Sequence, residues 1–372
     1  MSPKILILSY EYSPIGGGGG VFTKRLATGL ARLEDFHVDV VTGYHPSLPR
    51  HESQKNLRIW RVGIPRKNLA HVQFREMLSY SLSAVLWALK HNRTYDLVNS
   101  HFAVPSSIGA LPYRFLRRKP HVLTLLGSDV YNPFEYKRPL EIIRPFLHFL
   151  YNSADLLVAP SEDLRQRCYQ KKPRNPILVI PHGIDLEPYT SETQATKIGS
   201  IVCVSRLIPR KAHQYLVSAL PHIIQTVPEA TLCFIGDGPE TKHLQKLAKK
   251  LGVQSKVQFT GHLSQKEAIR KLATADIFAL HTLHEAFGLV YLEAMALGKP
   301  IVTTTEGAGR EVIGEAGLFV PPRDAKALAQ AITELIVNRE LRDKKGEAGL
   351  KRVNNYCWDA IIQRYAQIFK NC

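Results

Sequence analysis

Short apolar runs alternate with segments of helical apolar spacing along this chain, and the alternation occurs twice. The predicted strands of the first series are 4–9, 37–42, 96–100 and 121–126, and the pattern restarts after the apolar run 177–181. Those of the second series are 200–205, 230–235, 257–260, 277–280 and 300–304. Helical patterns such as 21–33 and 75–89 lie between them. This order predicts an α/β fold in which parallel, doubly wound sheets have helices on both faces.

The break between the two series predicts where the domains begin and end. At 372 residues the chain is too long for one ordinary core, so two domains are expected. We predict an N-terminal domain over 1–184, a polar linker over 185–198 and a C-terminal domain over 199–354. Apolar residues at helical spacing in the last segment, 355–372, predict a docked helix.

Composition narrows the class of protein. Hydrophobic residues make up 45% and charged residues 22% of the chain, which is typical of globular proteins. No apolar run approaches the ~20 residues that a membrane span needs, and the first residues lack the pattern of a signal peptide. The five cysteines are scattered without a CxxC pair, which favours reduced thiols and a cytoplasmic protein.

The net charge of +17 is unevenly distributed. Residues 1–180 contain 25 Lys and Arg against 13 Asp and Glu, so most of the excess lies in the first half. A basic face of this kind can meet nucleic acid, anionic lipid or a phosphorylated substrate, or can be a solvated surface. The amphipathic region 74–89 and the basic cluster 114–119 predict contact with an anionic membrane, at its cytoplasmic face.

Two carboxylates, Glu285 and Glu293, flank a junction between a glycine-containing loop and a helix. Eight helical residues would span about 12 Å, which is too far for both groups to act on one bond. The spacing suits the two ends of an extended ligand with a diphosphate in its middle, because the helix N-terminus between them attracts anions. The pair therefore predicts binding of a nucleotide-sugar.

Two further segments are expected to face anions. The five glycines at 16–20 follow the first strand and precede a helix, although they fit neither a Walker A loop nor a GxGxxG fingerprint. A flexible loop is the alternative interpretation of that run. Arg206 and Lys211 follow the first strand of the second series, where two cations can neutralise a diphosphate leaving group.

Six motifs, in the order in which they occur along the chain, resemble those of the retaining glycosyltransferases of family 4. They are the glycine run, Pro181-His182-Gly183-Ile184-Asp185, Ser205-Arg206-Leu207 with Lys211, Gly236-Asp237-Gly238-Pro239, Glu285-Ala286-Phe287-Gly288-Leu289 with Glu293, and Gly307-Ala308-Gly309-Arg310-Glu311. The resemblance covers nearly the whole chain. It implies the GT-B fold, in which two Rossmann-like domains face each other across a cleft and a C-terminal helix returns to the N-terminal domain.

The resemblance also implies roles for individual residues. Arg206 and Lys211 would hold the diphosphate, Glu285 the donor sugar and Glu293 the ribose hydroxyls. Further donor contacts would come from backbone groups or glycines, namely Phe287, Gly288, Leu289, Gly17, Gly18 and Gly238. The nucleotide-sugar would be a UDP-, GDP- or ADP-sugar, and the acceptor a glycan or a lipid-linked molecule.

The sequence departs from the family pattern at the segment that ends the fourth predicted strand. Leu126 stands where the family often has a histidine that contacts the donor sugar. His101 and Asp129 are the nearby candidates for a replacement contact on the acceptor or sugar side, although His101 also fits a buried structural histidine. Asn is usual at the position of His182, and a second glycine at that of Ala308.

A retaining mechanism implies front-face attack by the acceptor, with negative charge growing on the diphosphate. No Asp-x-Asp occurs in the chain, so no metal is expected, and the nucleotide-sugar is a substrate rather than a cofactor. Two other interpretations remain at this point. A nucleotide-sugar 2-epimerase would share the two-domain architecture, and a nucleic-acid binder would explain the charge but lacks interleaved aromatics and any known motif.

Overall fold

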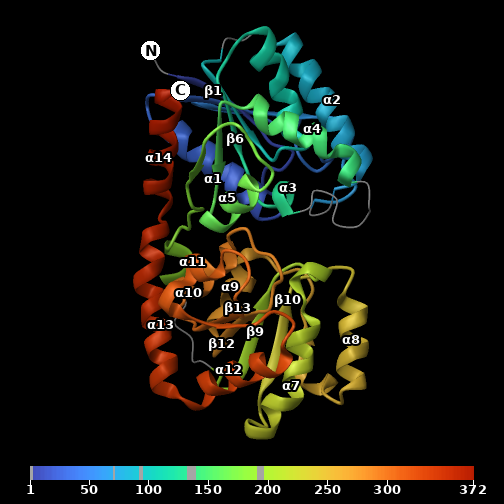
Figure 1. Ribbon diagram of the computed structural model, residues 1–372, viewed down its shortest axis with the longest axis vertical. Helices are drawn as coiled ribbons and strands as arrows, with labels where there is room; N and C mark the ends of the chain where they lie inside the picture. Colours follow the sequence, from blue (N-terminus) through green and yellow to red (C-terminus); the bar gives the residue numbers. More distant parts are fainter. Residues whose placement is uncertain (1–2, 70–71, 92–94, 132–139, 191–196) are drawn as a thin grey trace. The chain divides into compact units, whose positions relative to one another are not determined.

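The computed structural model describes residues 3–69, 72–91, 95–131, 140–190 and 197–372 (Figure 1). The chain forms two compact units. Unit 1 contains Met1–Gly183 together with Trp358–Cys372, and unit 2 contains Ile184–Cys357. Each unit is an α/β structure built around one sheet.

The sheet of unit 1 has eight strands in the order β3-β4-β2-β1-β5-β6-β7-β8. Their bounds are β1 Lys4–Leu8, β2 His37–Gly43, β3 His51–Gln54, β4 Leu57–Val62, β5 Leu97–His101, β6 His121–Thr124, β7 Leu156–Ala159 and β8 Ile177–Val179. All neighbours pair in parallel except β3 and β4, which form an antiparallel hairpin at the edge.

Helices cover both faces of this sheet. They are α1 Gly18–Arg32, α2 Phe74–Lys90, α3 Ser128–Tyr131, α4 Leu140–Ser153, α5 Glu162–Tyr169 and α14 Trp358–Asn371, with the short helices η1 Ser106–Ala110 and η2 Pro112–Leu116. Successive β1 residues enter different cores because side chains alternate along a strand. Ile5 and Ile7 lie in the core that contains residues of α1 and α14, whereas Leu6 and Leu8 lie in the core that contains residues of α2.

The predicted C-terminal helix is therefore present and packs on unit 1. Trp358, Ile361 and Tyr365 of α14 are buried in the core shared with α1. The two helices approach so closely that a methyl group at Gly29 would overlap the side chain of Ile362. Figure 1 shows α14 in red beside the blue α1.

The sheet of unit 2 has six strands in the order β11-β10-β9-β12-β13-β14, all in parallel. Their bounds are β9 Ser200–Val204, β10 Thr231–Ile235, β11 Val257–Phe259, β12 Ile277–Leu280, β13 Ile301–Thr304 and β14 Gly317–Val320. The strands are almost wholly apolar because both faces are covered, as in most parallel sheets.

The helices of unit 2 follow the strands in turn. They are α6 Glu187–Thr190, α7 Gln214–Thr226, α8 Thr241–Lys250, α9 Gln265–Ala273, α10 Leu289–Ala296, α11 Gly309–Ile313, α12 Ala325–Val337 and α13 Arg339–Val353, with short helices η3 Pro209–Lys211, η4 Gln254–Lys256, η5 Gly314–Ala316 and η6 Asn354–Tyr356. One contiguous apolar core joins them to the sheet. No helix in the described ranges has both the length and the apolar character to cross a membrane.

Several details differ from the sequence prediction. Strands β3, β4, β7, β8 and β14 were not predicted. Strand β3 is polar and mostly exposed at the edge of the sheet, whereas β4 pairs with strands on both sides and alternates buried with partly buried residues. The segment expected to be a linker starts with α6, and Tyr189 is buried in the core of unit 2. Residues 191–196 of that segment lie outside the described residues. Helix α1 begins at Gly18, so three of the five glycines are helical rather than in the loop.

Candidate functional site

The candidate site of unit 2 lies where the strand order changes direction. Strand β9 has β10 on one side and β12 on the other, so the loops after β9 and β12 diverge from the same carboxyl edge. Open α/β sheets bind ligands at this topological switch point. The loop after β9 carries Arg206 and Lys211, and the loop after β12 carries Glu285.

Lys211 and Glu285 form an ion pair between these two loops, although 74 residues separate them in sequence. The side chains are only 11% and 14% exposed, respectively. A backbone bond from Leu283 N to Arg210 O, 2.9 Å long, joins the same loops. Ala212 ends η3 in a left-handed conformation (φ 48°), which turns the chain from Lys211 into α7.

Burial and the ion pair act against each other on the protonation of both groups. Burial lowers the pKa of Lys211, while the Glu285 carboxylate opposes that shift. Burial alone would raise the pKa of Glu285, but Lys211 and Arg210 bring it below its usual value. The pairing thus favours the charged form of each group, and a low-dielectric pair of this kind interacts strongly with any further charge brought beside it.

The loop that carries Glu285 is shaped by close backbone packing. Gly288 has φ 85° and precedes α10, and a methyl group there would overlap the ring of Tyr291. Ala308 N donates to Glu285 O at 2.9 Å, so the loop after β13 supports the same residue. The side chain of Phe287 is buried against Tyr356, with ring centroids 5.7 Å apart.

Glu293 lies one turn into α10 and has a different environment from Glu285. Its carboxyl is half-buried and interacts with the hydroxyl of Tyr189 in α6. Burial raises the pKa of Glu293 to about 7, and the hydrogen bond to Tyr189 opposes that shift. The two carboxylates thus meet different partners at opposite ends of the α10 N-terminal turn, Lys211 for Glu285 and Tyr189 for Glu293.

The remaining predicted residues of unit 2 lie at the same sheet edge. Leu207 N donates to Asp237 O at 2.9 Å, and a methyl group at Gly238 would overlap Leu207 O, so the loops after β9 and β10 are in contact. The guanidinium of Arg206 is exposed and has no ion-pair partner within the described ranges. It adds to the positive field at Lys211, whose pKa it lowers.

In unit 1 the glycine run lies at the corresponding switch point, between β1 and β5. Gly17 caps α1 and Gly18 is its first residue. The Gly17 amide donates to the Glu11 carboxylate at 3.3 Å, and a methyl group at Gly16 would overlap that carboxylate. The chain's own anion therefore occupies the helix start that we expected to face a substrate anion.

His101 and Asp129 are buried in unit 1. His101 has no exposed surface, and its two ring nitrogens are 2.8 Å from Thr23 Oγ1 and 2.7 Å from Asn99 Oδ1. Burial and then the neighbouring His182 lower its pKa to about 3, so the ring is neutral. These contacts favour the structural interpretation of His101. Asp129 accepts from the backbone N–H groups of Gly127 and Ala103 at 3.0 and 3.2 Å.

Models of known protein families match most of this chain. Residues 16–188 match the family model described as "Glycosyltransferase Family 4", and residues 191–352 match "Glycosyl transferases group 1". The chain belongs to this glycosyltransferase family.

Individual relatives support the same grouping. A GDP-mannose-dependent alpha-(1-6)-phosphatidylinositol monomannoside mannosyltransferase of Mycobacterium tuberculosis is 30% identical over 62% of this chain. The match spans 66% of that relative's length. Among solved structures, sucrose-phosphate synthase from Thermosynechococcus elongatus has a TM-score of 0.80 with 21% identity, over 100% of this chain and 99% of that one.

Anabaena HepE, solved in complex with UDP and glucose, has a TM-score of 0.77 at 20% identity, with both chains covered completely. These neighbours are glycosyltransferases of the GT-B class, so the predicted fold class is confirmed. At these identities the structural likeness concerns the fold alone.

Three residues of this family member were not singled out from its sequence. Arg210 acts on the pKa of both Lys211 and Glu285, and its place beside Lys211 in the sequence was a usable signal. Tyr189 reaches Glu293 from a segment expected to be a linker, and no local pattern marked it. His213 follows Lys211 by two residues, and its Nε2 is 2.6 Å from Ser205 Oγ.

Leu126 and His182, two positions at which this chain departs from its family pattern, both pack against other side chains of unit 1. Leu126 is half-buried and packs against both cores of unit 1, so it acts as an apolar core residue. His182 stacks on Phe22 with ring centroids 4.6 Å apart. Within the described part of the chain, no three His, Cys, Asp or Glu side chains gather as a metal site would require. The absence of a metal requirement remains a prediction.

Proposed function

We propose that this chain is a retaining hexosyltransferase that moves a hexosyl group from a nucleoside diphosphate sugar to a hydroxyl acceptor. The observation that carries the proposal is the buried ion pair of Lys211 with Glu285 at the switch point of unit 2. A buried cation next to a helix start is suited to a diphosphate, and an adjacent carboxylate is suited to sugar hydroxyls. Membership of the family supports the same assignment.

The main task of the enzyme in this reaction is to stabilise the leaving group. The bond between the anomeric carbon and the diphosphate oxygen breaks, and negative charge grows on the diphosphate. Lys211, the exposed Arg206 and the backbone amides at the start of α10 would stabilise that charge. The acceptor oxygen bonds to the same face of the sugar, and its proton passes to the departing diphosphate.

Glu285 and Glu293 would hold the two ends of the donor. Glu285 is ionised beside Lys211, so both of its oxygens are acceptors for sugar hydroxyls. Glu293 would accept from the ribose hydroxyls once it is ionised, because a protonated carboxyl accepts fewer hydrogen bonds. With the carboxyl pKa of Glu293 raised to about 7, donor affinity should rise as the pH passes through neutrality.

The choice of donor to test first comes from the relatives. The Mycobacterium relative is named as GDP-mannose-dependent, and HepE was solved with UDP and glucose. UDP- and GDP-sugars are therefore the first donors, with ADP-sugars as a third class. The acceptor class proposed for this chain is a glycan or a lipid-linked hydroxyl.

Thermal unfolding with each nucleotide-sugar tests donor binding. A ligand at a hundredfold excess over Kd stabilises the native state by about 3 kcal/mol, which is readily measured. NMR of the anomeric proton after transfer reports the stereochemistry, and inversion would contradict the retaining mechanism. Conversion of the sugar while it stays on the nucleotide, without an acceptor, would instead support an epimerase.

We also propose that unit 1 rests on an anionic membrane, which would bring it to a lipid-linked acceptor. Helix α2 buries Tyr80, Ala84 and Trp87 on one side but exposes a second apolar stripe on the other. That stripe consists of Phe74, Leu78, Leu82, Leu86 and Leu89, each at least 50% exposed. A surface helix that exposes a second apolar stripe in addition to its buried side is unusual.

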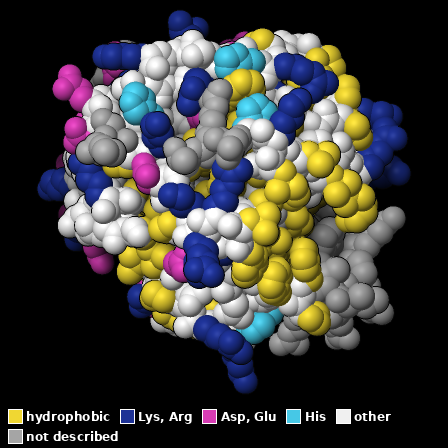
Figure 2. All heavy atoms as spheres, turned by 90° about the horizontal axis from the view of Figure 1, so that it is seen from above, with side chains coloured by type: hydrophobic (Ala, Val, Ile, Leu, Met, Phe, Trp, Pro, Cys, Tyr) yellow, Lys and Arg dark blue, Asp and Glu magenta, His cyan; other side chains and the backbone are white. Residues whose placement is uncertain are grey.

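Neighbouring elements extend this stripe. Phe115 and Leu116 of η2 are 56% and 71% exposed, and the ring of Phe115 stacks on Phe149 of α4 with centroids 6.0 Å apart. The same elements carry basic residues next to these side chains in the sequence, namely Arg75, Lys90, Arg114, Arg117, Arg118 and Lys119. Figure 2 shows hydrophobic side chains gathered on one face with Lys and Arg around them. Anionic lipid headgroups complement such a rim.

Sedimentation with anionic vesicles tests the membrane proposal. Leu82→Glu with Leu86→Glu should abolish co-sedimentation at low salt, whereas the control Val337→Glu, at a 61% exposed site on unit 2, should leave it unchanged. Equal binding of both variants, or no binding of the wild-type chain, would refute the proposal. A concentration-dependent dimer lost in the α2 variant would identify a second copy as the occupant.

A further inference from the structure

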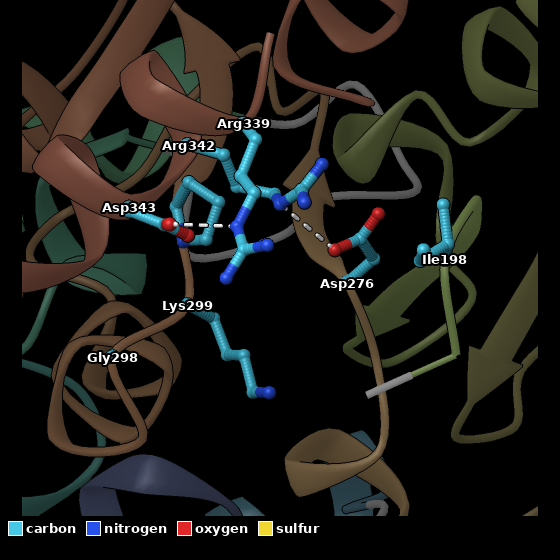
Figure 3. Close-up of a pocket in the computed structure, with 8 residues that line it drawn as sticks. Ile198, Asp276, Gly298, Lys299, Arg339, Arg342 and Asp343 are labelled. Carbon is cyan, nitrogen blue, oxygen red and sulfur yellow. Dashed lines mark hydrogen bonds and ion pairs between the residues drawn. The ribbon is translucent and has the colours of Figure 1, made fainter. Parts of the chain in front are cut away.

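A cavity of about 280 Å³ lies at the amino edge of the sheet of unit 2, away from the candidate active site. Asp276 directly precedes β12 and Lys299 lies just before β13, and both line the cavity with Arg339 and Arg342 of α13 (Figure 3). Glu285 instead follows the carboxyl end of β12. Because the four residues of β12 span roughly 13 Å, the cavity is a separate place in the fold.

The carboxylates of this cavity already have partners. Asp276 Oδ2 accepts the Gly199 N–H at 3.0 Å, and its Oδ1 lies 3.2 Å from Arg342 Nε. Asp343 Oδ2 lies 3.3 Å from Arg339 Nε. Three cationic side chains, those of Lys299, Arg339 and Arg342, thus surround two carboxylates, so the cavity has an excess of positive charge.

Arg339 has the donor capacity that a ligand would use. Its only described polar contact is through Nε, so both Nη nitrogens remain without a partner among the described residues. Figure 3 shows its guanidinium in the space between Arg342 and Lys299. The side chain is 85% exposed, and it belongs to the first residue of α13, where the helix dipole also favours an anion.

Lys299 and Arg342 form the fixed wall of the site. Lys299 is 8% exposed, and burial lowers its pKa while Asp276 opposes the shift. Arg342 Nη1 donates to the carbonyls of Leu335 and Ile336 at 3.2 and 2.7 Å, which holds its guanidinium at the end of α12. A wall held in this way needs little reordering when a ligand binds.

From this arrangement we infer that the cavity binds a small phosphate-bearing molecule that is not the sugar donor. Guanidinium and ammonium groups on converging walls are the usual partners of a phosphate, and Arg339 can bind one bidentately. The volume is near the lower end for small-molecule sites, which suits a hexose monophosphate or a smaller anion and is too small for a nucleotide-sugar.

Calorimetric titration of the full chain tests the site with three probes, namely inorganic phosphate, pyrophosphate and a hexose monophosphate. Arg339→Ala should weaken the binding of the preferred probe at least about tenfold, because a charge-assisted, bidentate contact is lost. Arg339→Glu should abolish it. The matched control is Lys351→Ala, which removes a positive charge from the far end of the same helix, and it should bind as the wild type does.

The same titrations separate this site from the candidate active site. Probe binding should persist in Lys211→Ala and under saturating nucleotide-sugar, and Arg339→Ala should bind the nucleotide-sugar normally. The ranking of the three probes distinguishes free phosphate from a phosphorylated sugar as the source. Equal probe affinity in Arg339→Ala and the wild type, loss of binding in Lys211→Ala, or no binding of any probe up to about 10 mM would overturn the inference.

Discussion

The two units present opposite charges at equivalent places in similar sheets. In unit 1 the switch point between β1 and β5 holds the glycine run, whose Gly17 amide faces the carboxylate of Glu11. In unit 2 the switch point between β9 and β12 holds Lys211 and the exposed Arg206 around a single carboxylate, Glu285. A helix start by itself does not decide what binds there, because the loop side chains set the sign of the field.

The buried histidines do not distinguish the two units. Burial lowers the pKa values of His101 in unit 1 and His213 in unit 2 to about 3, so both rings are neutral at pH 7. The difference lies at the switch points, because unit 2 places the buried ion pair of Lys211 with Glu285 there. A buried charge interacts strongly with a further charge brought beside it, and this supports placing the leaving group in unit 2.

Of the variants that test this comparison of the two switch points, Lys211→Ala should have the largest effect on activity and stability. We expect the rate of transfer to fall at least ~10²-fold, since one stabiliser of the developing charge is lost. The unfolding free energy should also fall by about 3–5 kcal/mol, because Glu285 is left as an unpaired buried charge. Steady-state kinetics and denaturant unfolding measure the two effects.

A second variant separates catalysis from stability at this pair. Adding Glu285→Gln to Lys211→Met removes both charges, so much of the stability should return while the rate stays low. The control Lys246→Ala, an exposed lysine of α8, should change neither quantity. Wild-type rates in Lys211→Ala would show that unit 2 does not hold the leaving group.

The pH dependence of stability should report on Glu293. Its folded-state pKa of about 7 is above the ordinary 4.5, so the folded state binds the proton more tightly than the unfolded state. This contribution is complete below about pH 4.5 and is lost as the pH rises through 7, by up to roughly 3 kcal/mol.

The isosteric variant Glu293→Gln provides the reference for this titration. Denaturant unfolding at pH 5 and pH 8 should show the wild type losing stability relative to Glu293→Gln over that interval. Parallel pH profiles of the two proteins would contradict the raised pKa. Donor affinity should change in the opposite direction, rising with pH in the wild type only.

Glu11→Ala tests the switch point of unit 1. Removing the carboxylate leaves the start of α1 without its side-chain partner, which should cost about 1 kcal/mol, as for the loss of a helix cap. The donor KM should change less than about threefold. A fall in turnover as large as that of Lys211→Ala would mean that unit 1 takes part directly in stabilising the leaving group.

Ala212→Gly should have the smallest effect on stability. It tests whether the positive φ at this position strains the loop after β9. The loop after β1 has positive φ at Gly16 (φ 90°), whereas the loop after β9 has it at Ala212 (φ 48°). Glycine at 212 should relieve about 1 kcal/mol of left-handed strain, offset in part by its greater freedom when unfolded. Thermal unfolding should show a small gain in stability, and a clear loss would imply that the methyl group packs usefully.

Much of the fold could be predicted because parallel strands that are buried on both faces form near-continuous apolar runs. The runs at β1, β9 and β12 stand out for this reason, and their order fixes a doubly wound arrangement. The hairpin of β3 and β4 was missed because neither strand is a continuous apolar run: β3 is polar and exposed at the edge, and in β4 the apolar residues are interrupted by Arg58 and Arg61. The helical start at Gly18 was missed because local propensity disfavours glycine in helices.

The sequence by itself determined the two sheets, the order of the motifs and the residue types suited to a diphosphate and a sugar. Only the tertiary structure decided which of them meet. Lys211 and Glu285 come together because β9 and β12 are neighbours in the sheet, and Tyr189 reaches Glu293 because α6 packs in unit 2. Local patterns encode burial and chain direction, whereas contacts between distant loops depend on strand order, which no local pattern contains.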